Sequence, residues 1–283
     1  MMRTFNHDGL ALSFRDEGAG PVLLFQHGLG ATADQPFEIM GDFDGFRRIT
    51  LECRGHGRSH LGAAEDLSIA TFADDLLALM DHLDIARAHV GGISMGAAIT
   101  TRFAVLNPLR AQSLCIARPA WFDRAAPDNM AIFAVASAFL EAHGVEEGRA
   151  RFEASAPFKA LQAASPDNAA SLLGQFDRPD PISTQLLLSR LAVDGPGISF
   201  ADYHALRLPV QVIGHGLDAV HPWSMAQAIA DAIPGSKRVE ITAKSTSKAR
   251  YLSEFSSALE RFVSAVEASE SAASDPVLGQ QHG

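Results

Sequence analysis

The chain has 283 residues, of which 47% are hydrophobic, and a formal net charge of −10 at pH 7. This size and hydrophobic content predict one sheet-centred core of enzyme size, and the negative charge argues against nucleic acid or an anionic membrane surface as a partner. Residues 1–8 lack the apolar segment of a leader sequence and no stretch reaches the ~18 apolar residues of a membrane span, so we expect a cytoplasmic location. The two cysteines, Cys53 and Cys115, stand in no metal-ligand spacing and are interpreted as small core residues rather than a disulfide.

The first elements that the sequence predicts are two strands, each followed by a glycine-rich loop. Pro21–Gln26 is a continuous apolar run, typical of a parallel strand buried on both faces, and it leads into the HGLG segment at 27–30. Arg48–Leu51 is a second strand-like run, and it leads into the RGHGRS segment at 54–59. The alternation of strands with loops and helices along the chain is the order of a doubly wound α/β sheet.

The next elements form a strand, a sharp turn and a helix around Ser94. A pattern with apolar residues three to four apart predicts a helix over 72–83, and residues 88–90 are strand-like. The pentapeptide GISMG at 92–96 follows and precedes an alanine-rich helical stretch. Glycines on both sides of the serine suit a strained turn in which any side chain would clash with the strand or the helix. We therefore interpret Ser94 as a nucleophile lifted above the sheet, with the first helix amides aimed at developing negative charge.

Taken together, these motifs resemble the α/β-hydrolase superfamily. The HGLG, ECRGHGRS (52–59) and GISMG segments are similar in particular to small bacterial esterases, enol-lactonases and cofactor-free haloperoxidases. Glu52 stands where that group usually has aspartate, a change that keeps the charge. The resemblance implies an α/β-hydrolase fold, with a mostly parallel doubly wound sheet and a helical cap inserted between core strands. It also implies a small-molecule substrate, no cofactor and no metal, and an oxyanion hole made by the amides of Leu29 and Met95.

The middle of the chain differs in character from both ends. From residue 121 to about 206 the sequence is helix-forming, is interrupted by prolines and shows no strand-like alternation. The resemblance implies that this segment is a cap that closes over the elbow. We expect Trp121 and Phe122, at the hinge nearest the elbow, to form walls of the substrate pocket, and the other cap residues to bury apolar sheet surface. The predicted boundaries are 1–119 and 207–266 for the hydrolase core, 120–206 for the cap and 267–283 for a disordered C-terminal tail.

The core resumes with a strand that ends in a loop containing Asp218. Residues 208–222 read LPVQVIGHGLDAVHP, and the resemblance places the acid of a catalytic triad in such a loop. Asp218 would accept the Nδ1 proton of an imidazole and stabilise the imidazolium that forms during catalysis. The alternative is that Asp218 only caps the helix that begins near Pro222.

The histidine that should complete the triad is absent from its usual position. The family places it after the acid, in the loop that follows the last strand, here Lys237–Ile241. That loop reads TAKSTSKARYL over 242–252, with Lys244 or Ser245 at about the expected position. Beyond Asp218 only His221 and His282 remain, and His282 falls in the predicted tail.

Four accounts of the missing base differ in chemistry. His221, in a loop at the carboxyl edge of the sheet, could serve as the base, or it could be a helix N-terminal residue packed under the cap. Lys244 could act as a neutral base, which requires burial to lower its pKa. His27 or His56 could do the work, although His27 suits an anchor of the oxyanion loop and His56 a structural network. In the fourth account catalysis is lost while the pocket is kept for binding.

The class of reaction can still be narrowed. A serine at the elbow argues against haloalkane dehalogenase or epoxide hydrolase chemistry, in which family members use an aspartate there. The sequence therefore predicts a serine hydrolase that acts on a small carboxylic ester or lactone through an acyl-enzyme. Ser94 would be the nucleophile, Asp218 the acid and His221 the candidate base. The alternative is a catalytically impaired protein on the same scaffold that binds a small molecule without turning it over.

Overall fold

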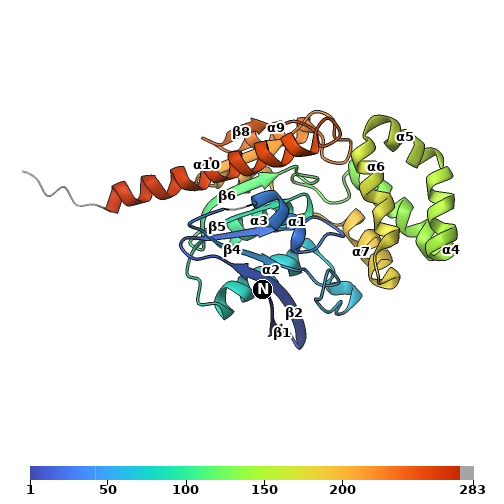
Figure 1. Cartoon of the computed structure of the whole chain (residues 1–283), viewed down its shortest axis with the longest axis horizontal. Helices are drawn as coiled ribbons and strands as arrows, with labels where there is room; N and C mark the ends of the chain where they lie inside the picture. The colour runs from blue at the N-terminus through green and yellow to red at the C-terminus, as the bar shows by residue number, and fades with distance from the viewer. Residues whose placement is uncertain (42, 275–283) are drawn as a thin grey trace, which may run out of the picture.

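The centre of the molecule is an eight-stranded sheet (Figure 1). The structure is a computed structural model that describes residues 1–41 and 43–274. The sheet has the strand order β1-β2-β4-β3-β5-β6-β7-β8. β2 runs antiparallel to β1 and β4, and the remaining pairs are parallel. The strands are β1 (Met2–His7), β2 (Leu10–Glu17), β3 (Val22–Gln26), β4 (Arg47–Leu51), β5 (Ala88–Ile93), β6 (Ala111–Ala117), β7 (Val210–Gly214) and β8 (Lys237–Glu240).

The central strands have continuous apolar or glycine sequences because both of their faces are covered. Every residue of β5 and of β7 is buried. The strands predicted from the sequence correspond to β3, β4, β5, β7 and β8. Because the carboxyl ends of parallel strands share one edge of the sheet, the loops after β3, β5, β6, β7 and β8 are gathered there.

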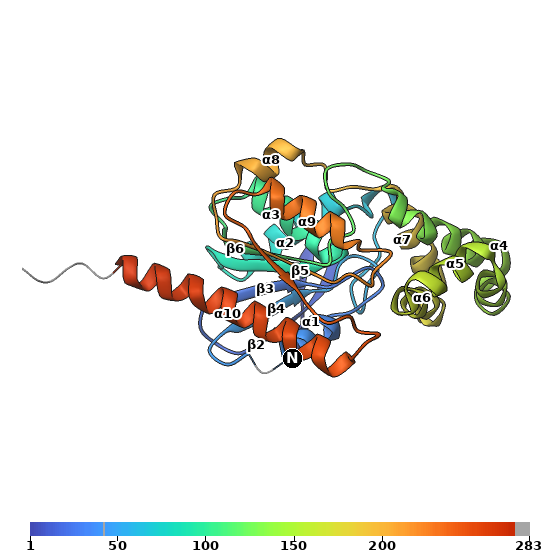
Figure 2. The same ribbon diagram turned by 90° about the horizontal axis from the view of Figure 1, so that it is seen from above.

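Helices cover both faces of the sheet (Figure 2). On one face lie α2 (Ile69–His82), α3 (Met95–Leu106) and α9 (Trp223–Ala232), and on the other lie α1 (Asp34–Met40) and α10 (Lys248–Ser274). Each face has its own core of buried side chains, for example Leu76, Ile99 and Ile229 on the first face and Phe37, Phe255 and Leu259 on the second. This arrangement confirms the predicted doubly wound, mostly parallel α/β sheet.

A group of helices between β6 and β7 stands beyond the carboxyl ends of the strands (Figures 1 and 2). Its elements are η2 (Asp128–Met130), α4 (Ala131–Ala154), α5 (Ala156–Ala164), α6 (Pro166–Leu173), η3 (Gly174–Asp177) and α7 (Pro181–Val193). The last helix of the segment, α8 (Phe200–Ala205), lies apart from this group and contacts α9 on the core. Its buried Tyr203 donates a hydrogen bond from the hydroxyl to the carbonyl oxygen of Phe122, at the start of the same segment. The predicted cap, residues 120–206, therefore includes a last helix, α8, that lies against the core.

The C-terminal helix is longer than the sequence analysis expected. α10 continues to Ser274, so residues 267–274 are helical and do not belong to a disordered tail. Alanine and glutamate favour the helix here, and Glu267 anchors it through a contact of 2.9 Å between its Oε1 and Nε2 of the buried His89. Residues 275–283, including His282, lie outside the described residues.

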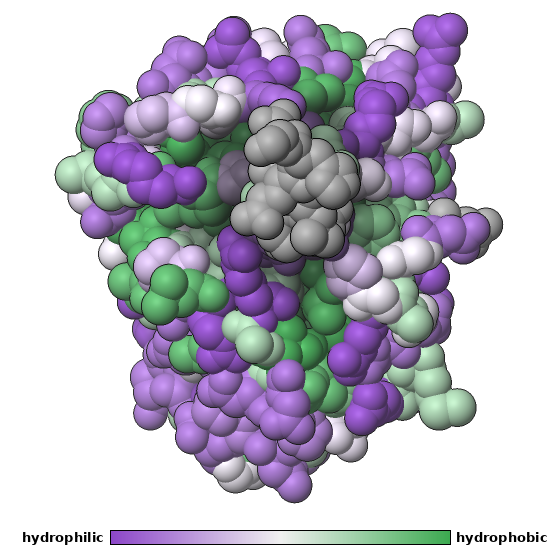
Figure 3. All heavy atoms as spheres, turned by 90° about the vertical axis from the view of Figure 1, so that its left-hand side faces the viewer, coloured by the Kyte–Doolittle hydropathy of each residue, from purple (hydrophilic) through white to green (hydrophobic). Residues whose placement is uncertain are grey.

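Figure 3 views the end of the molecule from which α10 projects, opposite the helices that follow β6. Hydrophilic side chains cover most of this face, and hydrophobic ones show mainly in the recesses between them. Within residues 1–41 and 43–274, no helix is long and apolar enough to cross a membrane. Cys53 and Cys115 are both buried and free, which confirms their interpretation as core residues.

Candidate functional site

Ser94 occupies a strained turn between β5 and α3. Its backbone has φ 57° and ψ −114°, in the left-handed half of conformational space that few residues other than glycine adopt. A Cβ added to Gly92 would come within 2.3 Å of the backbone of Gly96, and one added to Gly96 would come within 2.3 Å of the Gln26 carbonyl oxygen. The two glycines are therefore required by the close packing of β5, α3 and β3. The turn leaves the Ser94 side chain partly exposed at the carboxyl edge of the sheet.

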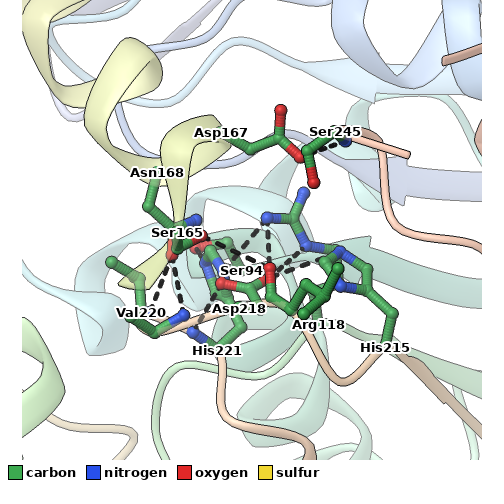
Figure 4. A network of polar contacts seen from close by, with 12 residues as sticks. Ser94, Arg118, Ser165, Asp167, Asn168, His215, Asp218, Val220, His221 and Ser245 are labelled. Atoms are coloured by element: carbon green, nitrogen blue, oxygen red, sulfur yellow. Dashed lines mark hydrogen bonds and ion pairs between the residues drawn. The ribbon is translucent and has the colours of Figure 1, made fainter. Parts of the chain in front are cut away.

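Three side chains form a continuous row of hydrogen bonds at this edge (Figure 4). His221 Nε2 lies 2.8 Å from Ser94 Oγ, and His221 Nδ1 lies 2.9 Å from Asp218 Oδ1. A carboxylate can only accept, so Nδ1 carries the imidazole proton and Nε2 is free to accept from the serine hydroxyl. This is the tautomer that a general base for Ser94 requires.

The loop between Asp218 and His221 is held in place by hydrogen bonds from the helices after β6. Asn168 of α6 accepts the N–H groups of Ala219 and Val220 through its Oδ1, both at 2.9 Å. Asn129 donates through Nδ2 to the Val220 carbonyl oxygen at 2.6 Å. Asp218 Oδ1 also accepts the backbone N–H of His221 at 3.0 Å. The sequence analysis missed both asparagines, because no local pattern relates them to a loop far along the chain.

Arg118, at the end of β6, is a further member of the site that the sequence analysis missed. Its Nε and Nη2 each lie 2.7 Å from Asp218 Oδ2, and its Nη1 donates to the Tyr251 hydroxyl at 3.3 Å. Nη2 is also 3.3 Å from His221 Nδ1. The signal that could have found Arg118 is its place directly after a buried strand, at the edge that gathers the other polar side chains.

Burial and neighbouring charges set the protonation of the row. Burial opposes the charged form of Asp218, but the His221 ring when it is protonated, the Arg118 cation and the hydrogen bonds from both outweigh it and hold the pKa of this carboxyl well below its ordinary value. Burial lowers the pKa of His221, and Arg118 adds to this effect while Asp218 opposes it. Burial and the Arg118 charge also lower the pKa of His215, just after β7, to about 4. At neutral pH the site therefore holds an ionised Asp218 and a neutral His221.

The HGLG loop after β3 lies next to Ser94, and its peptide groups are fixed by side chains. The Gly28 carbonyl oxygen accepts from His27 Nδ1 at 2.9 Å and from the Ala31 N–H at 3.1 Å. His27 Nε2 accepts from the Cys53 N–H at 3.1 Å, which settles that Nδ1 is the donor. With the Gly28 carbonyl held in this way, the orientation of the Leu29 N–H in the same peptide unit is fixed as well.

His56 and the helices after β6 also hold the HGLG loop in place. His56 Nε2 accepts from the Gly30 N–H at 3.0 Å, and Gln175 of η3 donates to the Leu29 carbonyl oxygen at 3.3 Å. In the described part of the chain, the N–H groups of Leu29 and Met95 have no acceptor. Because their ring nitrogens are occupied by the backbone, His27 and His56 are structural anchors rather than bases for Ser94.

The buried histidines predict a loss of stability in acid. Burial lowers the pKa of His27 to about 4, and the pKa values of His56 and His221 are lowered for the same reason. In the unfolded chain these imidazoles bind a proton near pH 6.5, whereas in the folded chain they resist it. The free energy of unfolding should therefore fall as the pH decreases from about 6.5 to about 4, by about 3 kcal/mol for His27 alone. Urea unfolding at pH 7, 5.5 and 4.5 measures this, and a constant free energy over that range would contradict it.

A cavity of about 110 Å³ opens beside Ser94. Its walls come from the HGLG loop, the elbow, α4, α6 and the loop after β8: Gly28, Leu29, Gln35, Ile93, Ser94, Arg118, Phe133, Asp167, Asn168, Ser171, Val220, His221 and Lys244. Trp121 and Phe122, predicted as pocket walls, are not among them. Trp121 is buried, with its indole N–H donating to the Asp194 carbonyl oxygen, and Phe122 packs against Tyr203. Both aromatic side chains contact residues near the end of the same segment, and Phe133 of α4 lines the cavity instead.

Lys244 is at the rim of this cavity and remains in contact with solvent. Its side chain is exposed and makes no hydrogen bond with Ser94. The burial that would make it a neutral base is therefore absent. The neighbouring Ser245 donates its N–H to Asp167 of α6, which ties the loop after β8 to the helices above it.

Comparison with known proteins agrees with this fold. Residues 21–245 match the family model described as alpha/beta hydrolase fold. The chain belongs to this family. A Mycobacterium tuberculosis protein named "Putative non-heme bromoperoxidase BpoC" is 30% identical over 241 residues, which cover 81% of this chain and 88% of the relative.

Solved α/β-hydrolase structures superpose over nearly the whole chain. The enol-lactonase from Burkholderia xenovorans LB400 has a TM-score of 0.71 at 20% identity and covers 94% of this chain and 100% of its own. A hydrolase from Pseudomonas aeruginosa PA01 has a TM-score of 0.68 at 25% identity and covers 94% and 97%. Within this α/β-hydrolase fold, the imidazole next to Ser94 comes from the loop after β7, whereas the family pattern places it after the last strand.

Proposed function

We propose that the protein is a serine hydrolase that cleaves a small carboxylic ester or lactone through an acyl-enzyme on Ser94. The observation that supports this most is the contact of 2.8 Å between His221 Nε2 and Ser94 Oγ, backed by Asp218 on Nδ1. It supports His221, from the loop after β7, as the proton acceptor in place of the missing histidine. The enol-lactonase among the similar structures and the esterases of this fold support the substrate class. The cytoplasmic location and the lack of a cofactor remain predictions.

The chemistry follows from the roles of the three side chains. Ser94 Oγ attacks the carbonyl carbon while His221 Nε2 takes the hydroxyl proton, and Asp218 stabilises the imidazolium that results. The N–H groups of Leu29 and Met95 would bind the oxyanion. When the tetrahedral intermediate collapses, the bond to the leaving alcohol oxygen breaks and that oxygen receives the proton from His221. Water activated by His221 then hydrolyses the acyl-enzyme and releases the acid.

The size of the cavity limits the acyl group. At about 110 Å³ it is smaller than the pockets of roughly 300–1,000 Å³ that enclose drug-sized ligands. Short acyl chains and small lactone rings therefore fit the space next to Ser94 best. The wall residue Phe133 supplies an apolar surface for such a group.

A fluorophosphonate probe tests the proposed nucleophile. The native chain should be labelled on Ser94, as peptide mass spectrometry would show, and should hydrolyse p-nitrophenyl acetate faster than p-nitrophenyl esters of long acids. Ser94→Ala should not be labelled. If the native chain shows neither labelling nor turnover above the Ser94→Ala background, the protein is a binding protein on this scaffold and the proposal is wrong.

Asn168 gives a test of how the base is positioned. Asn168→Ala removes the acceptor for two backbone N–H groups between Asp218 and His221, so the imidazole loses its fixed distance to Ser94. We expect kcat to fall about a hundredfold, because a displacement of about 1 Å in a catalytic group has effects of this size. Asn168→Asp, which keeps an acceptor oxygen at the same place, should retain more activity than Asn168→Ala. Equal losses in the two variants would speak against positioning through this acceptor.

A further inference from the structure

Arg118 is placed so that its side chain reaches the proposed acid and base together. Its backbone adopts φ 43°, a left-handed conformation, and its N–H donates to the Ile213 carbonyl oxygen of β7 at 2.7 Å. The side chain is 12% exposed, lines the cavity next to Ser94 and lies over the ring of Tyr251. Backbone strain and the burial of a cation both cost free energy, so we expect Arg118 to have a role at this edge besides packing.

The two oxygens of Asp218 have different partners. Oδ1 accepts from His221, through the ring Nδ1 and the backbone N–H, while Oδ2 lies 2.7 Å from both Nε and Nη2 of Arg118. A guanidinium stays charged at every pH at which proteins are folded. The Asp218 carboxylate is therefore shared between an imidazole and a permanent cation, and Figure 4 shows the guanidinium beside both.

This arrangement changes the electrostatics of His221. Arg118 Nη2 is 3.3 Å from His221 Nδ1, so protonation of the ring would place two positive groups in contact. The Asp218 carboxylate opposes this effect, and other titratable groups lie around the same site. They are the neutral His215 after β7, the exposed Lys244 after β8, Asp167 of α6, which lines the same cavity, and the Tyr251 hydroxyl of α10 behind Arg118.

We propose that Arg118 is a positioning residue that orients the Asp218 carboxylate and disfavours protonation of His221, so that the base stays available in weakly acidic solution. The consequence for catalysis rests on the proposed serine hydrolase function. The claim about the protonation of His221 does not, because it concerns the free protein. In such a hydrolase His221 is a weaker base at neutral pH, but it stays unprotonated, and the enzyme stays active, at lower pH.

Nitrogen NMR of the imidazoles tests the proposal without any substrate. The His221 signals are those that His221→Gln loses, and in the native chain they should titrate below pH 6.5. In Arg118→Met, which removes the charge, the midpoint should rise by about one pH unit or more. In Arg118→Lys, which keeps a cation, it should remain closer to the native value. A midpoint at or above 6.5 in the native chain, or one that Arg118→Met leaves unchanged, would overturn the proposal.

The pH profile of kcat/KM for p-nitrophenyl acetate gives the second readout. The acid limb should move to higher pH in Arg118→Met together with the NMR midpoint, whereas a merely structural role would lower activity equally at every pH. Tyr251→Phe, which removes one Arg118 contact and no charge, should leave the acid limb in place. Absence of turnover in the native chain would contradict the proposed function, and the native NMR midpoint would still decide the role of Arg118.

Discussion

Replacing Ser94 by alanine is expected to lower the turnover of a p-nitrophenyl ester by about a million-fold. Loss of the serine from a catalytic triad has an effect of this order, because the acyl-enzyme route is then closed. The turn itself should survive, since alanine is smaller than serine and Ser94 makes no side-chain cap for α3. Initial rates with p-nitrophenyl acetate, measured after active-site titration of the native enzyme, give the comparison.

The chain offers a matched control in a second row of serine, histidine and acid. Ser113 Oγ lies 2.8 Å from His89 Nδ1, and His89 Nε2 lies 2.9 Å from Glu267. Ser113 and His89 are buried within the sheet and line no cavity next to Ser94, so Ser113→Ala should keep native turnover and native labelling. If Ser113→Ala lost labelling while Ser94→Ala was still labelled, the nucleophile would be Ser113 and the assignment to Ser94 would be wrong.

Replacing His221 by alanine is expected to have an effect of the same size. In a serine protease, removal of the histidine alone costs about as much as removal of the whole triad, and the oxyanion hole leaves ~10³ to 10⁴ over the reaction in water. The double variant Ser94→Ala/His221→Ala should accordingly be nearly as active as either single variant. Kinetics of the three variants at pH 8 measure this lack of additivity.

Lys244 and His215 are the controls for His221. Lys244→Ala removes the residue at the family's usual histidine position, yet its exposed side chain makes no hydrogen bond with Ser94, so loss of activity should stay far below that of His221→Ala. The buried His215 lies 3.6 Å from Oδ2 of Asp218, whereas His221 is bonded to Oδ1, and His215→Ala should likewise spare most of the activity. Turnover that survives His221→Ala and disappears in Lys244→Ala would transfer the role of base to the lysine.

Much of the fold was predictable because its signals are local. An apolar run marks a strand buried on both faces, and glycines at 92 and 96 mark a turn in which a Cβ has no room. The same reasoning located the helical segment after β6. It overestimated the extent of that segment at α8, because no local pattern shows that α8 contacts α9 on the core rather than the other helices of the segment.

Trp121 and Phe122 do not line the cavity beside Ser94, and residues 267–274 are helical, for a related reason. Trp121 and Phe122 stand at the start of the segment after β6, but the indole of Trp121 bonds to Asp194 and the ring of Phe122 packs against Tyr203, both far along the chain. Residues 267–274 have the composition of a tail, yet contacts such as the one between Glu267 and His89 continue the helix along the sheet. Composition cannot predict contacts between segments that are distant in the sequence.

By itself, the sequence determined the order of strands and helices, the elbow at Ser94 and the loop that carries Asp218, since each depends on residues that are neighbours in the chain. It also named His221 as a candidate base. Only the tertiary structure decided that the His221 ring meets Ser94, 127 residues away. That meeting depends on Asn168, Asn129 and Arg118, which hold the Asp218 loop from other elements, and such distances are set by packing and long-range hydrogen bonds rather than by local propensity.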